Sequence, residues 1–470
     1  MLCGLVTELK HLVAGSVRLQ EGVVEDGSEI LWRGEGVGGE GSSVEVLWAI
    51  RSGIGDRQRV QLSAPSARGG IRAGLLSIIR GSLLAECVDL DGLPTARGLG
   101  MEKIASFRLV RTTLSWGGDS ISDLLHQKRV SKEKRNNGLK LSVLDQSPVP
   151  ADSTPGQALA NSIELAKLVD GLGYNRFWMS EHHAMDTLAC TAPEVMLARI
   201  GAETKRIRIG SGGIMLPHYT SLKVAECFRM LHALYPDRVD LGIGRAPGGG
   251  PIEALALKRE RKTRMLDDFP DQVSELLAFL GHRFPEEHPF AGIRVSPEMP
   301  GGPDVWMLGS SMWSSAAAVE FGLPYSFAHF FSPVHTRAAI ETYRRSFTPS
   351  IYRSEPEATV AVGVICAETQ AEAEFLASSV RLLQRRIRQG DRRPVASPED
   401  AVRELKLLGD MPMEEGEWPR YFVGTPSLVR EKLEQMAAEL GISELIVNTI
   451  VWEQAKRLRS YELLAGEFEK

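Results

Sequence analysis

The chain has 470 residues, of which 43% are hydrophobic and 24% are charged, and its formal net charge is −5 with a pI near 6.1. This composition is typical of a globular protein and gives no electrostatic reason to bind nucleic acid or an anionic membrane surface. No stretch approaches the roughly 18 to 20 uninterrupted apolar residues of a membrane-spanning helix, which excludes an integral membrane protein.

The five cysteines are scattered along the chain and never form a C-x-x-C pair. This pattern excludes a disulfide framework and a cysteine-rich zinc site, and it favours a reducing compartment. Near the start of the chain, Glu8 and Lys10 interrupt what would have to be the apolar core of a signal peptide. We therefore expect no secretion signal and a cytoplasmic location.

Residues 1–138 differ in composition from the rest of the chain. They hold 21 of the 46 glycines but only two of the 25 prolines, and glycine breaks their apolar runs before these reach helix length. Gly34, Gly36 and Gly39 fit the dinucleotide-binding spacing G-x-G-x-x-G, but neighbouring glutamates would repel a pyrophosphate and a strand-like run follows. We predict an extension of uncertain fold that ends in a basic linker, and one interpretation places the natural start of the protein near this linker.

From residue 139 onward, short β-rich runs alternate with stretches whose apolar residues recur at helical spacing. The predicted strands are 139–144, 175–179, 207–216, 239–243, 305–308, 325–327, 359–366 and 445–448. The predicted helices are 157–172, 193–204, 221–234, one within 263–280, 314–321, 336–347, 371–385, 427–440 and one that starts at 453. Strands and helices in this alternation favour an α/β fold with a closed (β/α)₈ TIM barrel over residues 139–470, rather than an open doubly wound sheet.

Functional residues of such a barrel lie at the carboxyl ends of the strands and in the loops that follow them. The polar and glycine residues at these positions are His182, then Ser211, Gly212 and Gly213, then Gly244 and Arg245, and finally Ser310, Ser311 and Ser314. A histidine can exchange a proton near neutral pH, and an arginine can hold a phosphate. Hydroxyl and backbone N–H groups at the start of a helix can help to bind that phosphate.

Other roles are compatible with the same residues. Glu181, His182 and His183 could ligate a metal or form structural hydrogen bonds. Adjacent residues on a strand point to opposite faces, and no second ligand cluster stands out, so we expect no metal site. Arg245 also suits a surface ion pair.

Five blocks of this part resemble the bacterial luciferase-like family of flavin-dependent oxidoreductases. They are LSVLDQSPV at 141–149, RFWMSEHH at 176–183, IRIGSGGIMLPHY at 207–219, RVDLGIGRAPGG at 238–249 and VWMLGSSMWSSAAAVEFGLP at 305–324. The resemblance extends from residue 139 to about 463 and leaves out the first part. It implies that His182 is the catalytic histidine beside the flavin ring, and that Gly212 and Gly213 form a non-prolyl cis peptide behind that ring.

The resemblance also implies a phosphate site with two departures from bacterial luciferase. Arg245 matches the phosphate-binding arginine, and Ser311 and Ser314 support it at the start of the following helix. Gly244 stands where luciferase has a reactive cysteine, so no thiol chemistry is expected. Ser310 stands where luciferase has a glutamate, and the loss of this negative charge could widen the choice of phosphorylated cofactor.

The function that the resemblance implies is a two-component monooxygenase. Reduced FMN arrives from a separate flavin reductase, and O₂ and a small organic substrate such as an aldehyde are the other reactants. The segment 389–419, rich in charge and proline, is expected to be irregular and matches a mobile loop of the family. It could serve as a lid over the site or be a disordered surface insertion. A homodimer is also expected.

Two alternatives stay open. One is a hydride-transferring oxidoreductase that uses the deazaflavin F420, and the other is a barrel that binds flavin without catalysis. Strand-end residues that could line the substrate space, although each also suits the core, are Trp178, Met215, Met307 and Phe327.

Overall fold

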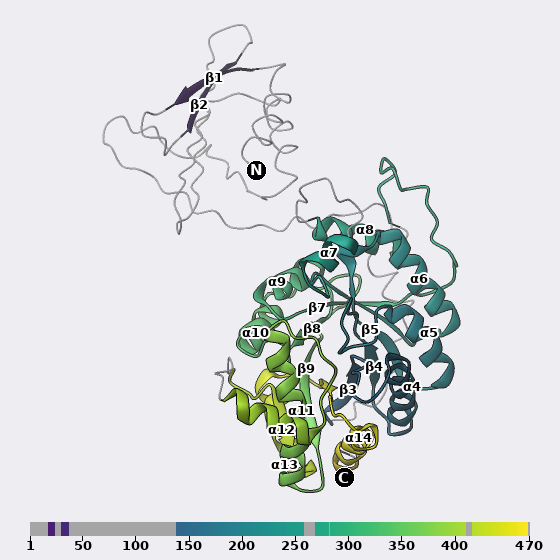
Figure 1. The fold of residues 1–470 in the computed structure, drawn as a ribbon. Helices are drawn as coiled ribbons and strands as arrows, with labels where there is room; N and C mark the ends of the chain where they lie inside the picture. Colours follow the sequence, from purple (N-terminus) through teal and green to yellow (C-terminus); the bar gives the residue numbers. More distant parts are fainter. Residues whose placement is uncertain are drawn as a thin grey trace. The chain divides into compact units, whose positions relative to one another are not determined.

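The computed structural model describes residues 17–23, 30–36, 138–257, 268–281, 283–409 and 416–468 (Figure 1). The chain divides into two units, Met1–Ser131 and Lys132–Lys470. In the first unit, β1 (Val17–Val23) and β2 (Ile30–Gly36) form an antiparallel pair. Gly34 and Gly36 therefore lie within a strand rather than in a loop that opens a helix, which argues against dinucleotide binding. Gly39 and the predicted basic linker lie outside the described residues.

The second unit contains a closed ring of eight parallel strands, which confirms the predicted TIM barrel (Figure 1). In ring order the strands are β3 (Lys140–Asp145), β4 (Arg176–Met179), β5 (Arg208–Met215), β6 (Val239–Gly244), β7 (Asp304–Gly309), β8 (Tyr325–Ala328), β9 (Ala358–Cys366) and β11 (Glu444–Asn448). The ring closes where β11 pairs with β3, from Glu444 opposite Lys140 to Val447 opposite Val143.

A ninth strand, β10 (Tyr421–Gly424), extends the sheet beyond the ring. The long strand β9 pairs with β8 as far as Ala361, and β10 takes up the pairing from Gly363 to Cys366. The sequence did not predict β10, because a run of four residues inside a charged, proline-containing segment shows no clear period.

Helices separate consecutive strands and cover the outside of the barrel (Figure 1). They are α4 (Pro155–Gly171), α5 (Pro193–Glu203), α6 (Ser221–Leu234), α7 (Pro251–Leu257), α8 (Phe269–Gly281), α9 (Met312–Phe321), α10 (Thr336–Ser346), α11 (Gln370–Arg388), α12 (Pro398–Leu408), α13 (Pro426–Leu440) and α14 (Gln454–Phe468). All were predicted except α7 and α12. Helix α12 corrects the expectation that 389–419 has no regular structure.

Local sequence explains where several helices begin. The side chains of Thr154, Thr369 and Ser397 each accept a hydrogen bond from a backbone N–H of the first turn of α4, α11 and α12. Such caps satisfy donors that have no partner within the helix. Proline in the first turn of α4 and α12 needs no such partner and has a backbone angle that suits a helix start.

Alternation along the strands separates two apolar layers. Side chains that point outward pack against the helices, while Leu144, Trp178, Trp306, Ala361 and Ile446 form a separate cluster inside the barrel. The two tryptophan rings meet edge to face with centroids 5.4 Å apart. The barrel interior is therefore a packed core, as its size requires.

Charged side chains fill the amino-terminal end of the barrel. Arg176 donates to Glu444 through Nε at 2.6 Å and through Nη2 at 2.9 Å, and to Asp240 through Nη1 at 2.9 Å. All three side chains are buried. The guanidinium of Arg176 holds the pKa values of Glu444 and Asp240 below their ordinary range despite burial, which raises them. This network joins β4, β6 and β11 and seals one end of the barrel.

Within the described part of the chain, no helix has both the length and the apolar character needed to cross a membrane.

We predict that Arg176→Met lowers the free energy of unfolding by about 3 to 5 kcal/mol, because it leaves the buried Glu444 carboxylate without its cation and removes one of the two arginines that pair with Asp240. Urea denaturation measures this change. The matched control is Arg381→Met, whose pair with Glu374 is about half exposed, and we expect it to cost less than about 1 kcal/mol. A similar small loss for Arg176→Met would show that the network does not hold the barrel end together.

Candidate active site

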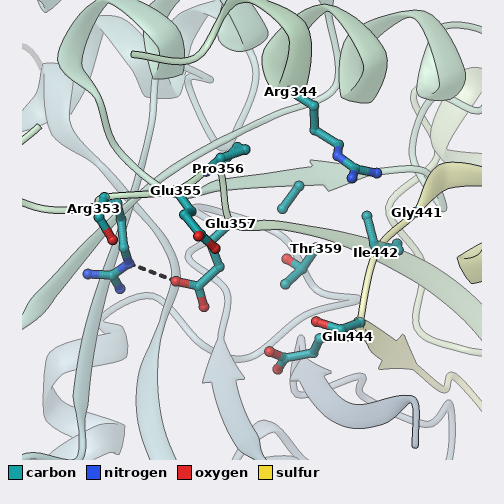
Figure 2. A pocket seen from close by; sticks show the side chains of 12 residues that line it. Arg344, Arg353, Glu355, Pro356, Glu357, Thr359, Gly441, Ile442 and Glu444 are labelled. Carbon is teal, nitrogen blue, oxygen red and sulfur yellow. Dashed lines mark hydrogen bonds and ion pairs between the residues drawn. The ribbon is translucent and has the colours of Figure 1, made fainter. Parts of the chain in front are cut away.

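The two ends of the barrel differ in what they offer a ligand. Figure 2 shows a cavity of about 340 Å³ lined by Arg344, Arg353, Glu357, Thr359 and Glu444, among others. These residues lie where β9 and β11 begin, at the sealed amino-terminal end. The residues predicted from the sequence follow the strands at the opposite end, where TIM-barrel active sites lie. We therefore place the candidate site at the carboxyl end of the strands, away from this cavity.

The peptide bond between Gly212 and Gly213 is cis, as the resemblance implied. It lies in β5 at an irregularity in the pairing with β6. A Cβ atom at Gly213 would approach the carbonyl oxygen of Gly242 to 2.8 Å, and one at Gly212 would approach a methyl of Leu144 to 2.5 Å. Both positions are therefore restricted to glycine by close packing on the two sides of the strand.

His182 lies in the loop after β4 and is half-buried. Its backbone N–H donates to the carbonyl of Cys190 at 3.0 Å, and a hydrogen bond of 3.2 Å joins its Nδ1 to the hydroxyl of Ser180. Desolvation, together with the neighbouring His183, lowers the pKa of His182 to about 4. The imidazole is consequently neutral at physiological pH and can accept a proton.

Arg245 is brought together with the start of α9. Its guanidinium carbon lies 3.9 Å from the ring centroid of Trp313, the second residue of that helix. Arg245 is exposed, and the helix cap residue Ser311 forms no side-chain cap. A cation and the N–H groups of a helix start thus face the same region, which is a chemical environment suited to an anion.

The predicted serines have different positions. Ser310 and Ser311 are accessible at the start of α9. Ser314 is buried, and its hydroxyl donates to the carbonyl of Ser311 at 2.7 Å and lies 2.9 Å from the hydroxyl of Tyr325. The hydroxyl of Ser211 is buried as well and donates to the carbonyl of Gly242 at 2.8 Å. The hydroxyls of Ser211 and Ser314 thus have partners within the barrel, and the part that these two residues take in cofactor binding stays a prediction.

Of the four candidate lining residues, three are core residues. Trp178, Met307 and Phe327 have at most 1% of their surface exposed, whereas Met215 is half-buried. The space above the end of β6 is instead reached at Gly244, where a Cβ atom would meet no other atom within 4 Å. Among the residues that the structure describes, no group of three or more histidine, cysteine or acidic side chains is arranged to hold a metal.

The sequence left open whether Glu181 forms structural hydrogen bonds or ligates a metal, and the structure shows the hydrogen bonds. Its carboxylate is fully buried and accepts hydrogen bonds from His183 Nε2 at 2.6 Å, Tyr219 Oη at 2.7 Å and the backbone N–H of Met215 at 3.0 Å. Its position beside His182 in the sequence was visible, but its partners after β5 lie more than 30 residues away. A single sequence carries no signal for such a contact.

Part of segment 389–419 lies against the loops of the candidate site. The backbone of Val395 pairs with Val149 and Ala151 after β3, with N–O distances of 2.8 Å. Arg392 donates to the carbonyl of Ala184 at 3.0 Å and to Glu253 at 2.7 Å. The segment thus joins loops that follow β3, β4 and β6.

These features fit a flavin phosphate and ring. The guanidinium of Arg245, the start of α9 and two accessible serines form a suitable donor set for a phosphate. Gly244 leaves the end of β6 without a side chain, and a Cβ atom there would meet no other atom within 4 Å, so a flat ring could approach this backbone closely.

Comparison with known proteins agrees with this geometry. The sequence profile of the family described as luciferase-like monooxygenase matches residues 139–444. The chain is 41% identical over 330 residues to the protein YceB of Bacillus subtilis (strain 168). This alignment covers 70% of this chain and 99% of YceB. This chain is also 34% identical over 328 residues to N-acetyl-S-alkylcysteine monooxygenase of the same organism. That alignment covers 70% of this chain and 97% of the monooxygenase. The crystal structure of apo-MsnO8 matches with a TM-score of 0.65 and 47% identity, over 71% of this chain and 98% of that chain.

The fold is a TIM barrel, and the candidate site lies at the carboxyl ends of its strands. The chain belongs to the luciferase-like monooxygenase family, as the five sequence blocks predicted. The family match begins at residue 139 and leaves the first 138 residues unmatched.

We predict that adding a methyl group lowers the stability of the protein at one glycine of the site and leaves it unchanged at another. Gly213→Ala forces contact with backbone atoms of Gly242 and should lower the free energy of unfolding by about 1 to 3 kcal/mol. Gly244→Ala, where the added atom meets nothing, serves as the control and should leave stability unchanged. Thermal unfolding of the purified variants measures both, and equal stability of the two would contradict the packing described for the cis segment.

Proposed function

We propose that this protein is a flavin-dependent monooxygenase that uses reduced FMN and O₂ to oxygenate a small organic substrate. The observation that carries the proposal is the stacking of Arg245 on Trp313 at the start of α9, on the same barrel end as the cis Gly212–Gly213 bond. One atom of O₂ enters the substrate and the other leaves as water, with two electrons from the reduced flavin. Reduced flavin, when bound, supplies the oxygen-activating chemistry.

The protein's own residues bind and orient the cofactor. Arg245 binds the phosphate through charge-assisted hydrogen bonds, and Ser310 and Ser311 add hydroxyl donors. The glycine backbone at 212, 213 and 244 supports the ring. Because these groups come from the ends of β5 and β6 and the start of α9, the barrel fixes the spacing between the donors that would hold the phosphate and the backbone that would support the ring.

His182 is the proposed catalytic residue. Its lowered pKa keeps the imidazole neutral, so it can accept a proton from the reacting groups and return it. We propose that segment 389–419 acts as a lid that excludes water, supported by the contacts of Arg392 with Ala184 and Glu253. Residues 139–470 then form the catalytic domain and residues 1–138 an extension to it.

The proposal includes partners and location. A separate flavin reductase supplies reduced FMN by transient contact. Exposed Val195 on α5 and exposed Met230 and Leu234 on α6 support a homodimer formed through these helices. The three described cysteines are free thiols, which fits the reducing cytoplasm.

The alternative cofactor is F420, with hydride transfer in place of oxygen insertion. The neutral side chain of Ser310 is compatible with F420. A carboxylate at this position would repel some phosphorylated ligands near Arg245, and serine does not. Both cofactors carry a phosphate that the same donors could bind.

We predict that Arg245→Ala weakens binding of FMN at least tenfold, or about 1.4 kcal/mol, because the phosphate loses its cation. Binding of riboflavin, which has no phosphate, should change less than twofold. Fluorescence titration of both ligands measures this difference. An equal loss for FMN and riboflavin would contradict a phosphate contact at Arg245.

The function itself is tested with ¹⁸O₂. We expect the wild-type protein, supplied with reduced FMN, to place one ¹⁸O atom into an aliphatic aldehyde or an N-acetyl-S-alkylcysteine, measured by mass spectrometry. His182→Ala should bind FMN as the wild type does and lose about 10² to 10⁴ in turnover. Since the pKa of His182 is near 4, the wild-type rate should show no acid limb around pH 6.5.

Unlabelled products with every substrate, together with substrate-dependent oxidation or reduction of F420, would replace the FMN proposal by hydride transfer. Unchanged turnover of His182→Ala would remove His182 from the mechanism.

A further inference from the structure

The buried carboxylate of Glu181 joins two separate segments of the candidate site, the loop after β4 and the connection from β5 to α6. It follows β4 directly and receives the N–H of Met215, the last residue of β5, only two positions beyond the cis peptide. It also receives the hydroxyl of Tyr219, just before α6, and the Nε2 of His183. Burial and the adjacent Glu181 carboxylate raise the pKa of Tyr219 above its ordinary value, so this hydroxyl stays protonated and can donate.

Two histidines extend this cluster to the loop that carries Arg245. The backbone N–H of His183 donates to the carbonyl of Gly248 at 2.9 Å. The ring nitrogen Nε2 of His218 lies 2.9 Å from the carbonyl of Pro247 and must donate to it, because a carbonyl only accepts. The His183 and His218 rings meet edge to face with centroids 5.9 Å apart. The loop after β6 is thus held from both sides.

The hydrogen bonds also fix which ring nitrogen carries a proton. His183 donates through Nε2 to a carboxylate, so its Nε2 is protonated. Burying a carboxylate is costly unless donors surround it, and here three donors converge on one group, two of them from the connection between β5 and α6.

We propose that Glu181 is a positioning residue that holds His182 and the Arg245 loop in register with the cis segment of β5. The inference rests on the proposed function for its consequence in catalysis, but the arrangement can be tested on the protein alone. Glu181 acts through His183, Tyr219 and Met215 and does not touch the reacting atoms.

The variant Glu181→Gln tests the proposal with the least change in shape. Its single amide oxygen can accept from His183 and Tyr219, but its NH₂ group then faces the N–H of Met215, donor against donor. The control is Glu194→Gln in the first turn of α5, which removes a nearby negative charge but no hydrogen bond within the cluster. Tyr219→Phe removes one donor and leaves the carboxylate in place.

Titration of His182 separates positioning from a simple charge effect. Among the described residues, His183 is the titratable neighbour that shifts the pKa of His182; Glu181 precedes His182 in the chain, and Cys190 binds the His182 N–H through its carbonyl. Removing a negative charge alone would leave the pKa of His182 unchanged or lower it further. Releasing the loop would admit water and raise the pKa toward the ordinary 6.5.

The experiment is an NMR titration of histidine-labelled, ligand-free protein between pH 5 and 8, with His182→Asn used for assignment. In the wild type and in Glu194→Gln, His182 should stay neutral throughout. In Glu181→Gln it should show a midpoint above pH 5, with a smaller change in Tyr219→Phe. If the Glu181→Gln variant folds and the titration of His182 in it is the same as in the wild type, the proposal is overturned.

FMN binding provides a second readout. Glu181→Gln should weaken FMN binding about tenfold, since the Arg245 loop loses its register, while Glu194→Gln binds as the wild type does. If Glu181→Gln does not fold, Tyr219→Phe carries the same test at reduced size, and unchanged titration and FMN binding there would overturn the proposal. If the wild type does not bind FMN at all, the proposed function fails, and the titration still decides the role of Glu181.

Discussion

Closure of the strand ring is the constraint on which the rest of this structure depends. The pairing of β11 with β3 joins segments about 300 residues apart and forces the carboxyl ends of all eight strands to one end. The buried Arg176 network fixes the opposite end, where Glu444 begins β11 and Asp240 lies in β6. The two ends have therefore separate tasks: one carries the charges that hold the barrel, and the other carries glycines, loops and a neutral histidine.

The amino-acid sequence predicted the barrel well because its strands are buried on both faces and its helices have regular apolar spacing. It failed where a segment is short or its signals conflict. Helix α12 has a capping serine, Ser397, and a proline at its first position, but the charge and proline around it favoured an irregular segment. Helix α7, with seven residues, follows three glycines and is too short to show a period.

The sequence was more informative about which residues lie near the candidate site than about where their side chains point. The sequence indicated the cis position at Gly212 and Gly213 only through family resemblance, because backbone isomers leave no trace in spacing. The sequence could not reveal that the Ser314 hydroxyl points inward to Tyr325. Several serines lie at the start of this short helix, and the sequence does not show which of them face the core. A structural hydrogen-bonding role for Glu181 was one open alternative, but its partners Met215 and Tyr219 could not be predicted, because hydrogen bonds between distant loops follow from the closed ring and not from local pattern.

Gly244 has a consequence for how the family can vary. Its neighbours Gly212, Gly213 and Gly242 are enclosed by other atoms, so each is fixed by the barrel. Gly244 is enclosed by nothing, and a new side chain there would alter the chemistry of the rim while the scaffold stays intact. Packing therefore does not restrict the residue at this position, and only a bound ligand can. Relatives with this fold can diverge in reactivity by a single substitution at the end of β6.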